Sequence, residues 1–186
     1  MGYCSCNRGW ILLLLILPVS VTECTYKFED CSKEDGIVQV SVFRVSPDPI
    51  DMKKNMSVTA RGELINRVPP GAMLETKYYR LRSVFGLQMD FPIPCLFGKY
   101  GSCTLPFCDY LERFKTQICP FFSNELYCGC PVLAGIYGGE NVEIEMTDLT
   151  AVRRFIAKDK YRSELRLKDG DTNKELACFK ITTELK

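Results

Sequence analysis

The stretch MSVTARGEL, residues 56–64, alternates between apolar and polar side chains over its whole length. Successive side chains of a β-strand point to opposite faces, so this alternation predicts a strand with one apolar and one polar face. The same period of two recurs in residues 142–146, 161–167 and 177–185. Strands of this kind are typical of antiparallel sheets with one solvated face, so we expect a mainly β protein.

Three further segments, residues 38–45, 74–81 and 84–91, alternate less cleanly but are rich in β-branched and aromatic residues, which also favours strands. The sequence KDGDTN at 168–173 suits a hairpin turn between the last two strands. Cysteines and prolines then interrupt residues 94–131, where we expect stapled loops. A short helix is possible at residues 106–114, because proline is favoured in a first helical turn.

The first segment reads as a signal peptide, residues 1–24, with cleavage near residues 22–24. Its apolar run, residues 11–17, is far shorter than the roughly 20 apolar residues that cross a bilayer, which disfavours a membrane anchor. Residues 25–186 are long enough for one domain with a substantial core, and no repeat or linker divides them.

Charge and cysteine content limit the environment and the partners. A net charge of +1 gives no overall field that would attract nucleic acid. Eleven cysteines behind a signal peptide indicate an oxidising compartment. We expect eight of them to be structural, with Cys24 either removed or spare. The sequon Asn55-Met56-Ser57 is an expected surface glycosylation site at Asn55.

The absence of histidine excludes a Ser-His-Asp triad, a Cys-His nucleophile and any zinc site that uses histidine. Acidic pairs such as Glu143 with Glu145 are expected to form solvated faces and not the two-carboxylate site of a glycosidase. The motif Cys128-Gly129-Cys130 lacks the spacing of a structural zinc site, and a secretory setting favours disulfides. We therefore expect no metal site, no cofactor and no catalysis by this chain.

Seven short motifs share one order and spacing with a known family. They are SPDPI at 46–50, PIPC at 92–95, GSCT at 101–104, FCDYL at 107–111, CP at 119–120, CGCP at 128–131 and GIY at 135–137. With these motifs the chain resembles the ganglioside GM2 activator family from Phe28 to Lys186. The resemblance implies an antiparallel β-cup or sandwich with a lipid cavity and a disulfide-stapled loop region that contains a short helix.

Spacing alone does not choose among the possible disulfide connectivities. The resemblance does, and it implies the pairs Cys31 with Cys178, Cys95 with Cys103, Cys108 with Cys130, and Cys119 with Cys128. The family also carries a sequon at the position of Asn55.

In function, the resemblance implies a non-enzymatic glycolipid-binding and transfer protein of the lysosome or the extracellular space. Such a protein extracts a glycosphingolipid from a membrane and presents it to a soluble glycosidase, which in the family is β-hexosaminidase, in ganglioside catabolism. Two alternatives remain open at this point. One is an extracellular lipid carrier or signalling module without a hydrolase partner, and the other is a cysteine-rich interaction protein with a filled core.

The residues expected to contact lipid follow from the resemblance, because periodicity alone would predict a solid core. From the strands they are Val58, Leu64, Ile144, Leu165 and Phe179. The rim of the cup is expected to include residues 149–161, where apolar side chains among basic ones suit transient contact with a membrane surface; a solvated turn is the alternative. The apolar residues of this segment are Leu149, Val152, Phe155 and Ile156. Phe121 and Phe122 are expected at a lip of the cavity or a partner contact, unless they pack back on the stapled loops.

Overall fold

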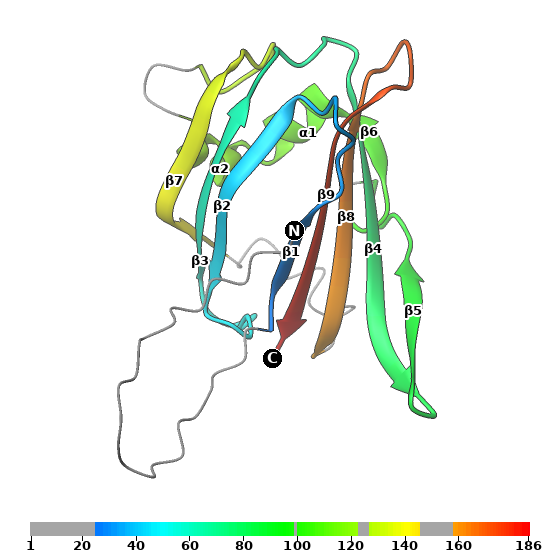
Figure 1. Ribbon diagram of the computed structural model, residues 1–186. Coiled ribbons are helices and arrows are strands. Elements are labelled where there is room, and N and C mark those ends of the chain that lie inside the picture. Colours follow the sequence, from blue (N-terminus) through cyan, green and yellow to red (C-terminus); the bar gives the residue numbers. More distant parts are fainter. Residues whose placement is uncertain (1–24, 99, 123–126, 146–157) are drawn as a thin grey trace, which may run out of the picture.

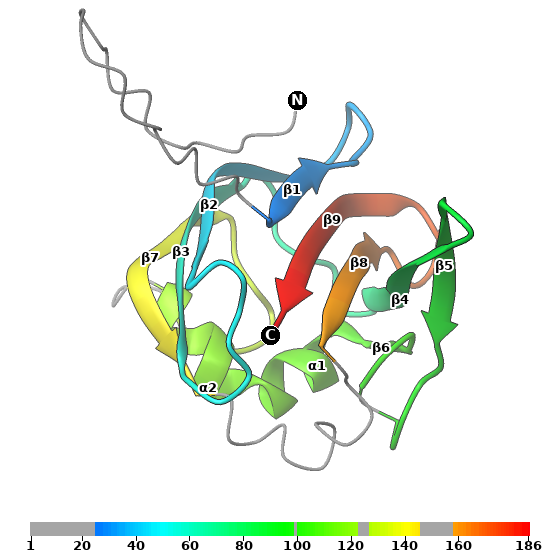
Figure 2. The same cartoon turned by 90° about the horizontal axis from the view of Figure 1, so that it is seen from below.

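The computed structural model describes residues 25–98, 100–122, 127–145 and 158–186. Two antiparallel β-sheets face each other, and a short helical segment lies along one side between them (Figures 1 and 2). The expected fold class, a mainly β sandwich with disulfides and a short helix, is confirmed. The predicted signal peptide lies outside the described residues. None of the described helices is long and apolar enough to cross a membrane.

The larger sheet has six strands in the order β1-β9-β8-β4-β5, and β6 pairs with β4 beside β5. Its strands are β1 (Lys27–Asp30), β4 (Met73–Val84), β5 (Leu87–Ile93), β6 (Thr104–Pro106), β8 (Asp159–Lys168) and β9 (Glu175–Leu185). The predicted hairpin turn joins β8 to β9. The outer face of this sheet carries ion pairs such as Arg162 with Asp90 at 2.7 Å and Arg166 with Glu175 at 2.8 Å. The inner face is therefore the one available for apolar packing.

The smaller sheet has the strand order β2-β3-β7. Its strands are β2 (Val38–Ser46), β3 (Met56–Leu64) and β7 (Gly135–Ile144). Strand β3 covers the residues predicted from the alternating stretch. Gly135, Gly138 and Gly139 lie in β7. A Cβ on Gly138 would lie 2.8 Å from the carbonyl oxygen of Ala60, so the close approach of β3 at a register shift requires glycine there.

The helical segment consists of α1 (Phe107–Arg113), α2 (Lys115–Ile118) and the 3-10 turn η1 (Cys119–Phe121). The predicted short helix is present as α1, which buries Leu111; Pro106, expected in its first turn, is the N-cap residue directly before it. Four disulfides join Cys31 to Cys178, Cys95 to Cys103, Cys108 to Cys130, and Cys119 to Cys128. These are the pairs that the resemblance implies. Two of them hold the helical segment against the loop that precedes β7, and the first joins the end of β1 to β9.

The interior is packed at one end of the sandwich and much less so at the other. The main core lies where β4 begins and β3 ends, and Leu111 of α1 completes it. Its buried members are Ile37, Leu64, Val68, Ala72, Leu111, Val132, Leu167, Leu176 and Ala177. A second and smaller cluster, made of Val45, Ile50 and Val58, packs beneath the smaller sheet. The main core thus packs the two sheets against each other at one end, and space remains between them at the other.

Candidate functional site: a cavity between the sheets

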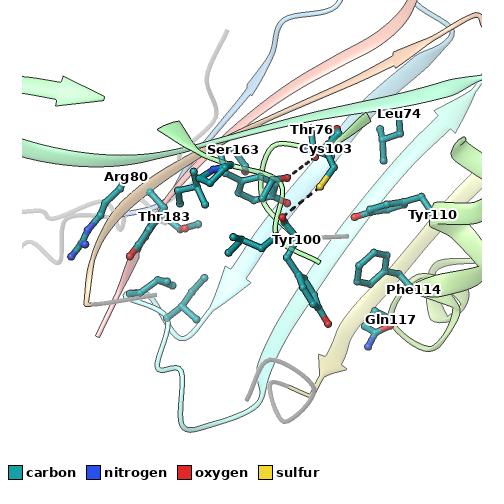
Figure 3. Close-up of a pocket in the computed structure, with 18 of the residues that line it drawn as sticks. Leu74, Thr76, Arg80, Tyr100, Cys103, Tyr110, Phe114, Gln117, Ser163 and Thr183 are labelled. Atoms are coloured by element: carbon teal, nitrogen blue, oxygen red, sulfur yellow. Dashed lines mark hydrogen bonds between the residues drawn. The ribbon is translucent and has the colours of Figure 1, made fainter. Parts of the chain in front are cut away.

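A cavity of about 930 Å³ lies between the two sheets, away from the main core. Residues of β4, β8 and β9 form one wall, and helix α1 and Phe114 form another (Figure 3). The segment stapled by Cys95 and Cys103, strand β5, the turn between β2 and β3, and the smaller sheet complete the lining. Ligand pockets in proteins span roughly 300–1,000 Å³, so this one is at the large end. If a methylene group takes about the volume of one liquid water, roughly 30 Å³, on the order of 30 of them would fill it.

Strand alternation explains why these side chains meet. Leu74, Thr76, Tyr78 and Arg80 are successive inward positions of β4 and all line the cavity. Tyr78 is paired with Ser163 of β8. Farther along the inner face of β8, towards the main core, large side chains close the gap. Small side chains such as Ser163 and Thr183 of β9 leave it open.

Aromatic rings form the wall opposite the sheet. The Tyr110 and Phe114 ring centroids lie 4.6 Å apart, and Tyr100 meets Phe114 edge-on at 6.4 Å. Burial raises the pKa of the Tyr110 phenol and that of the Tyr78 phenol across the cavity, because it disfavours the phenolate. Both phenols are therefore neutral at any physiological pH. These rings offer a large apolar surface suited to acyl chains, and Arg113 of the same helix also lines the cavity.

Two hydroxyl groups on the sheet wall, those of Thr76 and Ser163, have hydrogen-bond partners within the protein. Thr76 Oγ1 donates to the carbonyl oxygen of Gly101 at 2.8 Å and accepts from the backbone N–H of Cys103 at 3.1 Å. Ser163 Oγ donates to the carbonyl oxygen of Ile181 at 3.2 Å. Polar groups that already have partners do not require a polar ligand, so these two positions are compatible with an apolar chain.

Charged groups gather where the cavity opens. The Nε atoms of Arg80 and Arg82 both donate to Oδ2 of Asp159, at 2.7 and 2.9 Å. Hydrogen bonds from Arg82 and Arg80, in that order, lower the pKa of the Asp159 carboxyl below its usual value. Arg80 lines the cavity, whereas Arg82 lies one inward position farther along β4. Arg80, Arg82 and Asp159 thus form a group of two guanidiniums and one carboxylate at the cavity, and Arg113 and Glu145 are further charged residues of its lining.

We expect Asp159→Asn to lower the free energy of unfolding by about 1 kcal/mol or less at pH 7, as is usual for accessible ion pairs. Because the folded-state pKa is lowered, this stabilisation is complete above the unfolded value of about 3.9 and is lost only as the pH falls through the folded value. Urea unfolding of both proteins from pH 7 to pH 3 measures the difference. A difference that already shrinks between pH 7 and pH 5 would contradict this assignment.

The predicted lipid-contact residues lie in different parts of the structure. Ile144 lines the cavity. Val58 is buried in the second cluster, and Phe121 packs against that cluster. Leu64 belongs to the main core, and Phe122 and Phe179 pack against it. Leu165 pairs with Thr76 but is not among the lining residues. Val58, Leu64 and Phe179 thus pack into the two hydrophobic clusters and are not among the lining residues. Phe121 and Phe122 pack back against these clusters, which is the alternative that the sequence left open for them.

The four rim residues in 149–156 lie outside the described residues. Sequence reasoning missed most of the wall that the structure does show, including Tyr78, Tyr110 and Phe114. One signal for it was available, since Ser163 occupies an inward position among apolar residues of its strand. A small polar side chain on an apolar face marks a place where the interior is not filled.

The chain was compared with protein families, with curated proteins and with solved structures. A family model described as ML domain matches residues 25–185. Among solved structures, the crystal structure of a Niemann-Pick type C2 protein from Japanese carpenter ant is similar, with 15% sequence identity and a TM-score of 0.43. The similarity covers 86% of this chain and 98% of that one. No curated protein matches the sequence.

Proposed function

The chain belongs to the ML-domain family of lipid-binding proteins, and from this premise we propose that it lifts a glycosphingolipid out of a membrane and presents it to a soluble glycosidase. Proteins of this family are typically lipid binders without enzymatic activity. The four disulfides indicate folding in an oxidising compartment of the secretory pathway. Within that pathway, we propose the lysosome or the extracellular space as the place of action.

The cavity is the observation that carries the proposal. An acyl chain of about 16 methylenes costs on the order of 13 kcal/mol to hold in water, so a carrier must offer a comparable apolar surface. A lumen of about 930 Å³ lined by apolar and aromatic side chains offers such a surface. A polar head group would remain at the mouth, where Arg80 and Arg82 lie. That position would leave the head group accessible to a second protein.

The choice of a glycosphingolipid and of β-hexosaminidase as partner rests on the motifs shared with the ganglioside GM2 activator family. Asn55 is exposed in the turn before β3, at the same end of the molecule as the cavity mouth, and a glycan there would be sterically allowed. We propose this residue as the glycosylation site.

Native mass spectrometry of the protein purified from eukaryotic cells tests the lipid-binding step. We expect masses above that of the glycosylated chain by one lipid, and extraction should identify a lipid with one or two long acyl chains. A protein that stays empty in mixtures of sphingolipids and glycerolipids would overturn the proposal.

The presentation step has its own test. We expect the protein to increase the hydrolysis of a ganglioside in vesicles by β-hexosaminidase, but not that of a short soluble substrate that needs no extraction. Lipid binding without any such increase would favour a carrier or signalling module that has the same cavity and no hydrolase partner.

A further inference from the structure

Two tyrosines of the cavity wall carry phenol groups without a hydrogen-bond partner. Tyr78 lies on the inner face of β4, paired with Ser163 of β8, and Tyr110 lies on α1. Among the described residues, none forms a hydrogen bond with either phenol oxygen, whereas the hydroxyls of Thr76 and Ser163 both have partners. Figure 3 shows the Tyr110 side chain extending from α1 towards the interior of the cavity. A partner for these two phenols therefore has to come from the contents of the cavity.

The two phenols offer a pair of hydrogen-bond donors to one region of the cavity. Burial raises the pKa of both, and for Tyr110 the Tyr78 phenol raises it further. The second effect is electrostatic, so the two groups lie near each other. Both phenols keep their protons, and each neutral phenol can donate one hydrogen bond. Two donors from different walls of the cavity thus face the same space.

Strand β4 fixes the depth of this pair. Its inward positions run from the buried Leu74, through Thr76 and Tyr78, to Arg80 where the cavity opens. Alternate residues of a strand are about 7 Å apart, so Tyr78 lies one such step inside Arg80. Deeper in the cavity, Thr76 Oγ1 already donates to the carbonyl oxygen of Gly101. The unpartnered donors therefore lie at the boundary between the charged opening and the apolar interior.

An acyl lipid has a hydrogen-bond acceptor at this boundary. If its head group stays at the opening and its chain runs towards Leu74, the carbonyl that joins the two falls a short step inside the opening. A carbonyl oxygen has two lone pairs and can accept from both phenols. A plain hydrocarbon chain at the same place would leave two desolvated donors without an acceptor, which is unfavourable.

We propose that Tyr78 and Tyr110 donate hydrogen bonds to the carbonyl oxygen of an ester- or amide-linked acyl chain, so that the cavity selects acylated lipids over lipids with ether-linked chains. The inference rests on the proposed lipid-binding function and names the chemical group that the site recognises. A glycosphingolipid has an amide carbonyl and a glycerolipid has ester carbonyls, so both classes meet this requirement.

Titration with two matched phosphatidylcholines tests the selectivity. One has ester-linked and the other ether-linked chains of the same length, short enough for both lipids to stay monomeric in water. We expect the wild type to bind the ester lipid roughly tenfold more tightly, because two neutral hydrogen bonds together are worth about that factor. In Y78F/Y110F the ratio of the two affinities should fall to about one. A short-chain sphingomyelin, which has an amide carbonyl, should weaken together with the ester lipid.

The matched control is Tyr79→Phe, which removes a phenol oxygen from the next residue of the same strand. Its ring lies on the outer face of the sheet, where the Cζ atom of Arg162 is 4.7 Å from the ring centroid. This variant should keep the wild-type ratio, whereas Tyr78→Phe and Tyr110→Phe alone should each give an intermediate ratio. Circular dichroism should show that all four variants are folded.

Infrared spectroscopy of bound lipids with a ¹³C-labelled carbonyl detects the hydrogen bonds directly, because they lower the C=O stretching frequency. The frequency should be lower on the wild type and on Tyr79→Phe than on Y78F/Y110F. Equal frequencies on all three proteins, for the ester lipid and for sphingomyelin, would contradict the assignment.

The outcomes separate this inference from the proposed function. If none of the three lipids binds to any of the proteins, the proposed function fails. If the lipids bind but Y78F/Y110F weakens neither the ester lipid nor sphingomyelin relative to the ether lipid, the cavity holds lipid without reading its carbonyl, and this inference alone fails. Weakening of only one of the two would identify the ester or the amide as the linkage that the phenols recognise.

Discussion

Replacement of both Cys31 and Cys178 by alanine is expected to lower the free energy of unfolding by roughly 5 kcal/mol, the chain-entropy value for a bond that closes about 150 residues. The two cysteines are 147 residues apart in the sequence. Domains are commonly stable by only about 5–15 kcal/mol, so this loss removes much or all of the margin. Cys178 is completely buried, and its replacement also leaves unfilled space. Urea unfolding and the secreted yield measure the effect.

The variant C119A/C128A is the matched control, because it also removes one disulfide but from a sequence separation of only 9. The same chain-entropy reasoning gives it a loss of roughly 2.5 kcal/mol. The long closure stabilises more because its absence frees nearly the whole domain in the unfolded state. Equal losses in the two variants would show that local strain or packing, and not chain entropy, dominates at these bonds.

Strands with one solvated face were predictable from the sequence, because a sheet with one face in water needs polar side chains at every second position of its strands. Strand β3 has the predicted bounds, Met56–Leu64. The first half of β7 was not predictable in this way. Gly138 is required there by the close approach of β3, which is a long-range contact that a local pattern does not reveal.

The position of the cavity was not predictable from periodicity. Leu64 and Ile144 obey the same alternation, yet Leu64 is buried in the main core and Ile144 lines the cavity. The difference lies in what each side chain meets across the sandwich. At one end large residues and α1 fill the space, whereas at the other Ser163 and Thr183 do not. The alternation of side chains indicates which face of a strand is apolar, but not whether the apolar faces of the two sheets are in contact.

Filling the cavity from the sheet wall is therefore expected to abolish lipid binding and keep the fold. In the variant S163F/T183F, two phenyl rings would occupy space inside the lumen between β8, β9 and the aromatic wall. Each ring displaces about six carbon atoms of a bound chain, and at about 0.8 kcal/mol per methylene the loss is roughly 5 kcal/mol per ring. Affinity should thus fall by roughly a hundredfold or more, even if the lipid recovers part of the contact elsewhere.

The control for this variant is Thr182→Phe, which places a ring on the outer face of β9, one position from Thr183. It should bind lipid like the wild type in native mass spectrometry and in titration with a fluorescent lipid. The free energy of unfolding of S163F/T183F should be equal to or above that of the wild type, because its rings bury apolar surface without displacing other side chains. Normal lipid binding by a folded S163F/T183F would mean that acyl chains do not occupy this space, whereas unfolding of the variant would mean that the space between the sheets is closed in solution.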